Sequence, residues 1–195
     1  MKKLSLKHIV LSFILGICIT SIGMAQQTSR SNIMDIRLNG TSSLHDWEMK
    51  AVKGTSEISY VVDAKGNITS ISKLTFSLPA KNLKSDHTMM DNNTYKALKA
   101  DNNPNLSFVL TSAKITATGS NTYQLNCSGK LTIAGTTRET QLIATGKYNA
   151  SEKTFTVTGL QKMKMTDYNV TPPKAMLGTI KTGNDISISY NVKFS

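Results

Sequence analysis

The sequence predicts an all-β fold, because apolar and polar residues alternate along most of its length. The clearest run covers residues 123–133, where every odd position is apolar or glycine and every even position is polar. A period of two places one face of the segment in a core and the other in water, which is typical of a β-strand. Tight turns separate this run from similar runs, and such strands build an antiparallel sandwich or a closed barrel.

The expected strands follow one another along the chain with short turns between them. Residues 26–31 are polar and are expected to be frayed. Early strands are expected over 33–38, 45–52, 57–63 and 68–78, and the alternation returns from Leu106, Tyr123, Leu142, Phe155 and Ile186. Glycine or small polar residues mark the turns at 64–67, 119–121, 134–136 and 150–152. The pattern therefore predicts hairpins for most of the sheet.

Two segments interrupt the alternation. Residues 88–100 have no period of two but are rich in helix formers near 95–100, so they predict one or two short helices. Residues 163–183 have no clear period and include Pro172 and Pro173. A loop of about twenty residues inside a compact domain is often functional. We expect both segments to cover an end of the sheet structure.

Residues 1–25 have the pattern of a cleaved secretory signal peptide. Three lysines precede an apolar run over 9–22, and small residues stand before a cleavage site after Ala25. The run is shorter than the roughly 20 residues of a membrane-spanning helix. Removal of the leader leaves one domain, 26–195, with the single cysteine Cys127 and no disulfide. We therefore expect a bacterial periplasmic protein, with extracellular release as the alternative.

The charge pattern argues against a nucleic-acid partner. The formal net charge is +11, and loss of three lysines with the leader leaves +8. The basic residues are scattered singly along the chain and are not interleaved with aromatic residues. A nucleic-acid-binding surface would concentrate them on one element. We expect a solvated basic surface that contacts a membrane only peripherally.

Few residues indicate catalysis or a metal site. His45 and His87 each stand beside an aspartate, but no third ligand follows at a useful spacing and no nucleophile or phosphate-binding motif is found. Cys127 lies on the inward face of its strand, which predicts a buried structural thiol. We therefore expect no enzyme activity, no metal and no cofactor, and the role of the two histidines stays open.

Three segments of the sequence resemble motifs of one protein family. Segment 38–47 (LNGTSSLHDW) resembles the family's early Gly-Ser/Thr-x-x-His segment. The stretch 90–98 followed by 104–108 (PNLSF) is similar to a Pro-x-Ile-x-Phe signature. Segment 129–138 (GKLTIAGTTR) is similar to a Gly-x-Leu-Thr-Ile-x-Gly-x-Thr-Arg/Lys hairpin. In order and spacing the three segments cover nearly all of the mature chain. Together they resemble the YceI-like family of exported bacterial proteins, which bind lipids or polyisoprenoids.

The resemblance implies a single antiparallel lipocalin-like β-barrel of about eight strands, with a short helical insert and a long apolar cavity. The implied ligand is an amphipathic lipid such as a polyisoprenoid or an isoprenoid quinone, carried or sequestered by a monomer or homodimer. Inward parity and the two irregular segments predict the residues that line the cavity and its mouth. They are Phe76, Leu78, Phe108, Leu110, Leu125, Leu131, Leu142 and Phe155 in the cavity, and Tyr95, Leu98, Met163, Met165, Met176 and Leu177 at the mouth. The candidates for meeting an anionic head group are Lys84, His87 and Lys164.

Two other functions are compatible with the same residues. A fully packed barrel would be a structural or interaction module whose basic surface docks a partner without a ligand. An enzyme acting on the bound lipid would place His45 or His87 at the cavity with a carboxylate partner. Small inward residues such as Gly129, Ala144 and Gly146 weakly favour a hollow barrel. Whether the barrel is hollow or packed therefore decides between the first two functions.

Overall fold

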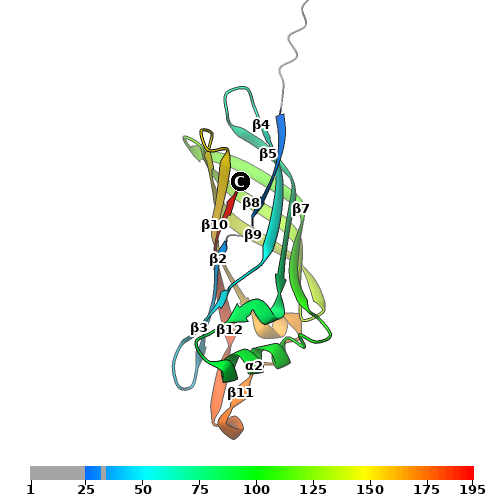
Figure 1. Ribbon diagram of the computed structural model, residues 1–195, viewed down its shortest axis with the longest axis vertical. Coiled ribbons are helices and arrows are strands. Elements are labelled where there is room, and N and C mark those ends of the chain that lie inside the picture. Colours follow the sequence, from blue (N-terminus) through cyan, green and yellow to red (C-terminus); the bar gives the residue numbers. More distant parts are fainter. Residues whose placement is uncertain (1–24, 32–33) are drawn as a thin grey trace, which may run out of the picture.

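The computed structural model describes residues 25–31 and 34–195, and it is an antiparallel β-structure with one α-helix (Figure 1). This confirms the predicted all-β fold with a helical insert. The predicted signal peptide lies outside the described residues apart from Ala25, so its cleavage stays a prediction. In the described part of the chain, no helix is long and apolar enough to cross a membrane.

The strands occur in the chain order β1 (Ala25–Ser31), β2 (Met34–Ser42), β3 (Trp47–Ala51), β4 (Thr55–Val62), β5 (Ile68–Pro79), β6 (Leu83–Lys84), β7 (Asn105–Gly119), β8 (Thr122–Ile133), β9 (Thr136–Asn149), β10 (Thr154–Lys164), β11 (Lys174–Ala175) and β12 (Ile180–Phe194). The helical elements are η1 (Ala80–Asn82), α2 (Thr88–Ala97), η2 (Met165–Tyr168) and η3 (Met176–Gly178). Hydrogen bonds join the strands in the order β1-β4-β5-β7-β8-β9-β10-β12-β2-β3-β6, and β11 pairs with β12.

The expected number of about eight strands is too low, because residues 25–31 and 34–195 contain twelve. Three of the strands are β3, β6 and β11, which are two to five residues long and too short to show a period. The polar segment expected to be frayed forms β1, which pairs with β4 over seven residues. Backbone pairing along an existing edge stabilises such a strand without an apolar pattern of its own.

The sheet curls back on itself, so that its first strand, β1, reaches the end of β12. The backbone groups of Arg30 in β1 and Ser195 after β12 exchange two hydrogen bonds of 3.3 and 3.4 Å. Near the other end of the sheet, the Val52 amide donates to the Asn82 carbonyl oxygen at 3.0 Å, which ties the end of β3 to η1. The strands therefore enclose one interior, as expected for a lipocalin-like barrel.

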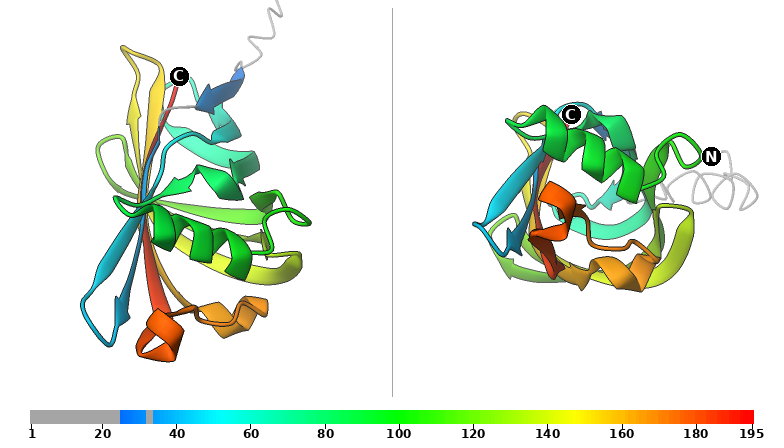
Figure 2. Two further views of the ribbon diagram at one scale, coloured as in Figure 1. Left: turned by 60° about the horizontal axis from the view of Figure 1, so that its bottom comes forward. Right: turned by 90° about the horizontal axis from the view of Figure 1, so that it is seen from below.

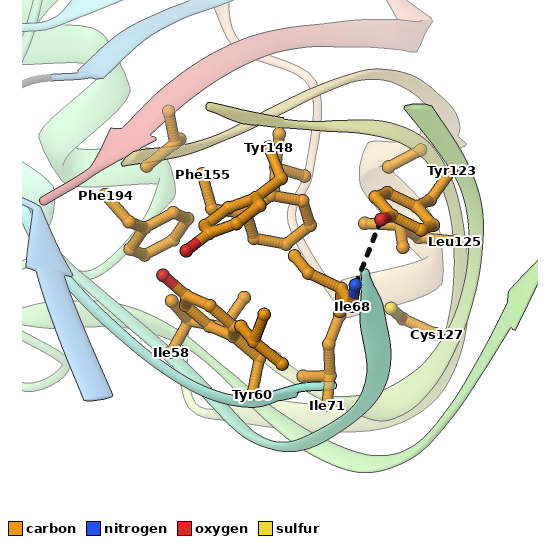
Figure 3. Close-up of a cluster of buried hydrophobic side chains, with 14 residues drawn as sticks. Ile58, Tyr60, Ile68, Ile71, Tyr123, Leu125, Cys127, Tyr148, Phe155 and Phe194 are labelled. Atoms are coloured by element: carbon orange, nitrogen blue, oxygen red, sulfur yellow. Dashed lines mark hydrogen bonds between the residues drawn. The ribbon is translucent and has the colours of Figure 1, made fainter. Parts of the chain in front are cut away.

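One end of this interior is solid. Rings from β4, β9 and β10 meet there, with the Tyr60 centroid 5.9 Å from that of Tyr148 and 5.5 Å from that of Phe155 (Figure 3). The hydroxyl of Tyr123 accepts a hydrogen bond from the Ile68 amide at 3.0 Å. Ile58, Leu125, Cys127 and Phe194 fill the remaining space, and all four are buried. We call this cluster the packed end.

The opposite end is covered by the two segments that break the alternation. Figure 2 shows α2 and the η2–η3 segment lying across this end of the barrel. The hydroxyl of Tyr95 in α2 lies 2.9 Å from the Leu83 carbonyl oxygen and 3.0 Å from that of Lys81. The carboxylate of Asp91 accepts hydrogen bonds from the Ser85 amide at 2.7 Å and the Ser85 hydroxyl at 2.8 Å. These bonds fix the helix over the barrel, at what we call the open end.

Candidate functional site: an apolar tunnel with a polar mouth

An apolar chamber of about 140 Å³ lies in the middle of the barrel. Five of the predicted lining residues surround it, one from each of five successive strands in the sheet: Phe76, Phe108, Leu131, Leu142 and Met163. The period of two brings them to one interior, because each strand turns the same face inward. The side chains of Ser56 and Gln161 also reach the wall, but both are hydrogen-bonded within the protein. The Ser56 hydroxyl donates to the Thr75 carbonyl oxygen at 2.7 Å, and the Gln161 amide donates to the Lys162 carbonyl oxygen at 3.3 Å. The chamber can therefore hold an apolar group.

A narrower space of about 80 Å³ continues from the chamber toward the open end. Met163 and Ile188 line both spaces, so the two are adjacent. The predicted residues Leu98, Met165 and Lys164 are at this passage. Two polar groups on its wall are occupied, since the Tyr168 and Thr140 hydroxyls are 2.9 Å apart and the Trp47 indole donates to the Thr41 carbonyl oxygen at 2.9 Å. The passage extends the apolar wall to the covering segments.

The passage leads to a wider mouth of about 410 Å³. Trp47, Thr94, Met165 and Pro173 line both the passage and the mouth, so chamber, passage and mouth form one tunnel. The mouth has polar and apolar walls and is lined by residues of the β2–β3 loop, α2, β11 and the start of β12, which include Ser42, Leu44, His45, His87, Met89, Asn93, Lys174 and Thr182. An apolar interior with a polar entrance suits an amphipathic molecule.

The structure brings His45 and His87 to this mouth from segments forty-two positions apart. The His45 Nδ1 atom lies 2.6 Å from the Asp46 carbonyl oxygen. The side chains of His45 and His87 are both exposed. Among residues 25–31 and 34–195, neither imidazole is hydrogen-bonded to a carboxylate, and no three metal-ligating side chains of the His, Cys, Asp and Glu types come together. The arrangement offers hydrogen-bond donors to a polar group at the entrance.

The head-group candidates differ in position. His87 lines the mouth, and Lys164 lies at the passage with an exposed side chain. Lys84 does not line these spaces, because its Nζ atom lies 3.5 Å from the Asp91 carboxylate and 5.2 Å from the centre of the Tyr95 ring. Contact with the Tyr95 hydroxyl and the charge of Asp91 raise the pKa of Lys84. Its charge is therefore already compensated within the protein.

Several predicted lining residues lie away from the tunnel. Leu125 and Phe155 are buried in the packed end, where the Phe155 ring covers Gly146. Leu110 packs against that cluster, whereas Leu78 and Tyr95 pack around the open end. Met176 and Leu177 are exposed to solvent. Parity identifies an inward face but not the depth at which the interior is empty, so these residues face the interior or its rim without lining the space.

Other residues of the tunnel were not predicted. Ile186 and Ile188 are two residues apart in β12, so both point to the same face of that strand, which is the inward face. The alternation alone could have identified them. Met49 and Trp47 alternate in the short strand β3, which gives too few repeats to decide the inward face. Other unpredicted wall residues include Ile36, Leu38, Leu74, Leu83, Leu106, Tyr190 and Val192.

Solved structures with the same fold include three bacterial proteins. BcnA from Burkholderia cenocepacia is 18% identical, with 82% of this chain and 95% of BcnA covered and a TM-score of 0.64. A polyisoprenoid binding domain from Saccharophagus degradans, implicated in plant cell wall breakdown, is 9% identical, with 89% and 99% covered and a TM-score of 0.61. The Campylobacter jejuni YCEI protein is 16% identical, with 99% and 97% covered and a TM-score of 0.51. At these identities the likeness establishes the fold.

Sequence comparison identifies the family. No curated protein matches the chain. A family model described as a YceI-like domain matches residues 27–194, which include all the strands of the sheet except the first two residues of β1. The three segments that resembled the family lie at β2–β3, at α2 with the start of β7, and at the β8–β9 hairpin, and each contributes residues to the tunnel. The chain belongs to the YceI-like family.

Proposed function

We propose that this protein is an exported carrier or sequestering protein that holds an isoprenoid or another amphipathic lipid. The observation that supports the proposal most directly is the continuous tunnel from an apolar chamber to a polar mouth. The apolar chain would occupy the chamber and passage, and the head group would stay near His87 and His45. The polyisoprenoid binding domain from Saccharophagus degradans, which shares the fold, supports a ligand of this class.

The energetics favour an apolar chain in this tunnel. Each buried CH₂ group contributes about 0.8 kcal/mol to binding. A chamber of about 140 Å³ left empty costs roughly 3 kcal/mol of stability at the usual value of ~24 cal/mol per Å³. A ligand that fills the chamber recovers part of that cost. A lipid tail would therefore bind without specific polar contacts, and the mouth would set the preference among head groups.

Export to the periplasm rests on the leader pattern of residues 1–25. A binding role without catalysis is supported by the exposed histidines, which lack a carboxylate partner among the described residues.

The alternative of a packed interaction module is favoured by the packed end alone. The open end argues against it, because a module without a ligand has no need of an apolar tunnel that reaches the surface.

The first test is native mass spectrometry of the protein purified from a bacterial periplasm, followed by organic extraction and addition of isoprenoid alcohols of increasing length. We expect a bound mass that matches an isoprenoid or acyl chain, or uptake of the added alcohols. A protein that carries no lipid and takes up none would contradict the proposal and would favour the interaction module.

A pair of variants on one strand locates the binding. Met163→Trp places a bulky ring where the chamber meets the passage, and we expect lipid uptake to fall by about tenfold or more. Leu160→Trp is the matched control, because Leu160 lies on the outer face of β10 with 56% of its surface exposed. Circular dichroism establishes that both variants fold. Equal uptake by the two variants would show that the lipid binds elsewhere.

A further inference from the structure

Exposed apolar side chains gather around the mouth. Leu44 in the β2–β3 loop, Met89 in the first turn of α2, and Met176 and Leu177 in η3 are each at least 64% exposed, and Leu177 is fully exposed. Leu44 and Met89 line the mouth, and Met176 directly follows Ala175, which lines it too. We call these four residues the rim. Large apolar side chains gathered on one surface in this way mark an interaction site.

The rim is held together by the backbone. The amide of Ser43 donates to the Lys181 carbonyl oxygen at 2.9 Å, and the Lys181 amide donates to the Ser43 hydroxyl at 3.1 Å. These bonds join the β2–β3 loop to the beginning of β12, which directly follows η3. Seen from the open end, α2 and the η3 segment lie over the same end of the barrel (Figure 2). The four side chains therefore belong to one surface.

The backbone of η3 presents the apolar side chains to solvent at a steric cost. Met176 and Leu177 have φ angles of 50° and 54°, and Gly178 follows with 90°. Residues with bulky side chains rarely adopt this left-handed conformation, and two in succession need a compensating role. Neither side chain gains burial in the protein. A partner that buries them would supply the compensation.

The charges next to η3 are positive, whereas Asp46 and Asp86 stand two and three residues from Leu44 and Met89 in the other part of the rim. Lys174 and Lys181 are cross-strand partners in the β11–β12 pair that η3 connects, and both side chains are exposed. Residues 174–183 contain no acidic side chain. Apolar side chains flanked by lysines are the combination that binds the interface of a membrane containing anionic lipids, where the apolar groups enter the acyl boundary and the lysines meet the head groups.

We infer that the rim docks on the surface of an anionic phospholipid bilayer, with the mouth of the tunnel facing the membrane. Docking in this orientation would let a lipid pass between bilayer and tunnel without crossing water. A second copy of the chain fits the rim less well, because a two-fold contact centred on β11–β12 would bring the Lys174–Lys181 pairs of both copies together. The docking depends on the rim and its lysines and does not require the proposed cargo.

Vesicle sedimentation with delipidated protein tests the inference. We expect binding to vesicles of equal parts phosphatidylglycerol and phosphatidylcholine and much weaker binding to pure phosphatidylcholine. The double variant Met176→Ser/Leu177→Ser removes the most exposed apolar groups, and we expect about tenfold weaker binding. Lys174→Glu/Lys181→Glu should weaken binding by about tenfold or more, with a smaller effect at high salt.

The matched control is Ile143→Ser/Leu160→Ser, which removes two apolar side chains that are 58% and 56% exposed on the outer wall and should leave vesicle binding unchanged. Met163→Trp should also bind vesicles normally, which separates docking from lipid uptake. The inference is overturned if wild-type protein ignores the anionic vesicles or if the wall variant loses as much binding as the rim variant. It is also overturned if ultracentrifugation shows that the rim variant instead loses a dimer.

Discussion

The two ends of this barrel are built from the same strands but differ in what fills them. At the packed end, Tyr60, Tyr148 and Phe155 are fully or almost fully buried and their rings touch. Toward the open end, aliphatic side chains and the rings of Phe76, Phe108, Tyr190 and Phe194 surround a chamber of about 140 Å³. The period of two is the same in both halves. The packing of the inward side chains and the covering segments, and not the strand pattern alone, therefore decide where this barrel is hollow.

Glycines do not create the space. Gly129 and Gly146 have the inward parity expected of a hollow barrel, but the ring of Phe108 lies over the first and the ring of Phe155 over the second. A side chain at either glycine would collide with that ring. In each half of the barrel a neighbouring aromatic ring fills the space that the glycine leaves. Small inward residues therefore do not identify a cavity.

The largest expected effect is the loss of a ring from the packed end. Phe155 is 0% exposed, and Phe155→Ala should lower the free energy of unfolding by about 3–5 kcal/mol because it opens a new cavity. Phe76→Ala removes the same ring from the chamber wall, where Phe76 is only partly buried, and should cost about 2 kcal/mol. Urea unfolding of lipid-free protein measures both. Equal losses would show that the chamber wall is packed as tightly as the other end.

Enlarging a side chain should also destabilise the packed end more than the chamber. Leu142 and Ala144 lie two residues apart on the inward face of β9, the first at the chamber and the second in the packed end. Ala144→Leu should lower the free energy of unfolding by about 1–3 kcal/mol through overpacking, whereas Leu142→Phe should change it by less than about 1 kcal/mol. Chemical denaturation of both variants provides the comparison. A large loss from Leu142→Phe would mean that the chamber cannot accept added volume.

The third expected effect concerns the polar contacts that hold the open end. Burial raises the pKa of Asp91, but hydrogen bonds from Ser85 and the charge of Lys84 outweigh it, so the pKa lies below its ordinary value of 3.8. A carboxyl with a lowered folded-state pKa stabilises the protein above its ordinary pKa, and this stability is lost as the pH falls through the folded-state value. Asp91→Asn should therefore cost about 1–2 kcal/mol at pH 7 and much less at pH 2. The same cost at both pH values would argue against the charged contact.

Much of the fold could be predicted from the sequence because it depends on local patterns. Alternation places β8 within one residue of its observed bounds, and the loss of alternation locates α2. Strand β1 was missed because backbone pairing with β4, and not its own side chains, holds it in the sheet. Five of the fourteen predicted lining residues surround the chamber, since parity gives direction but not depth. The two irregular segments predicted part of the mouth, including His87 and Met165, but the β2–β3 loop at the mouth could not be predicted, because folding brings together loops that are distant in the sequence.

The smallest expected effect tests whether the buried hydroxyl groups of the packed end all have hydrogen-bond partners. Tyr60 is fully buried, and burial is the main cause that raises its pKa, whereas the nearby Ser29 hydroxyl lowers it. No hydrogen bond of acceptable geometry joins the Tyr60 hydroxyl to any described residue. A buried hydroxyl without a partner costs free energy, so Tyr60→Phe should leave stability unchanged or raise it by up to about 1 kcal/mol. The control is Tyr123→Phe, which should lower stability by about 1 kcal/mol because its hydroxyl accepts the hydrogen bond from Ile68. If thermal unfolding showed the same loss for both variants, the Tyr60 hydroxyl would have a partner in solution, and the packed end would be held by polar contacts as well as by its rings.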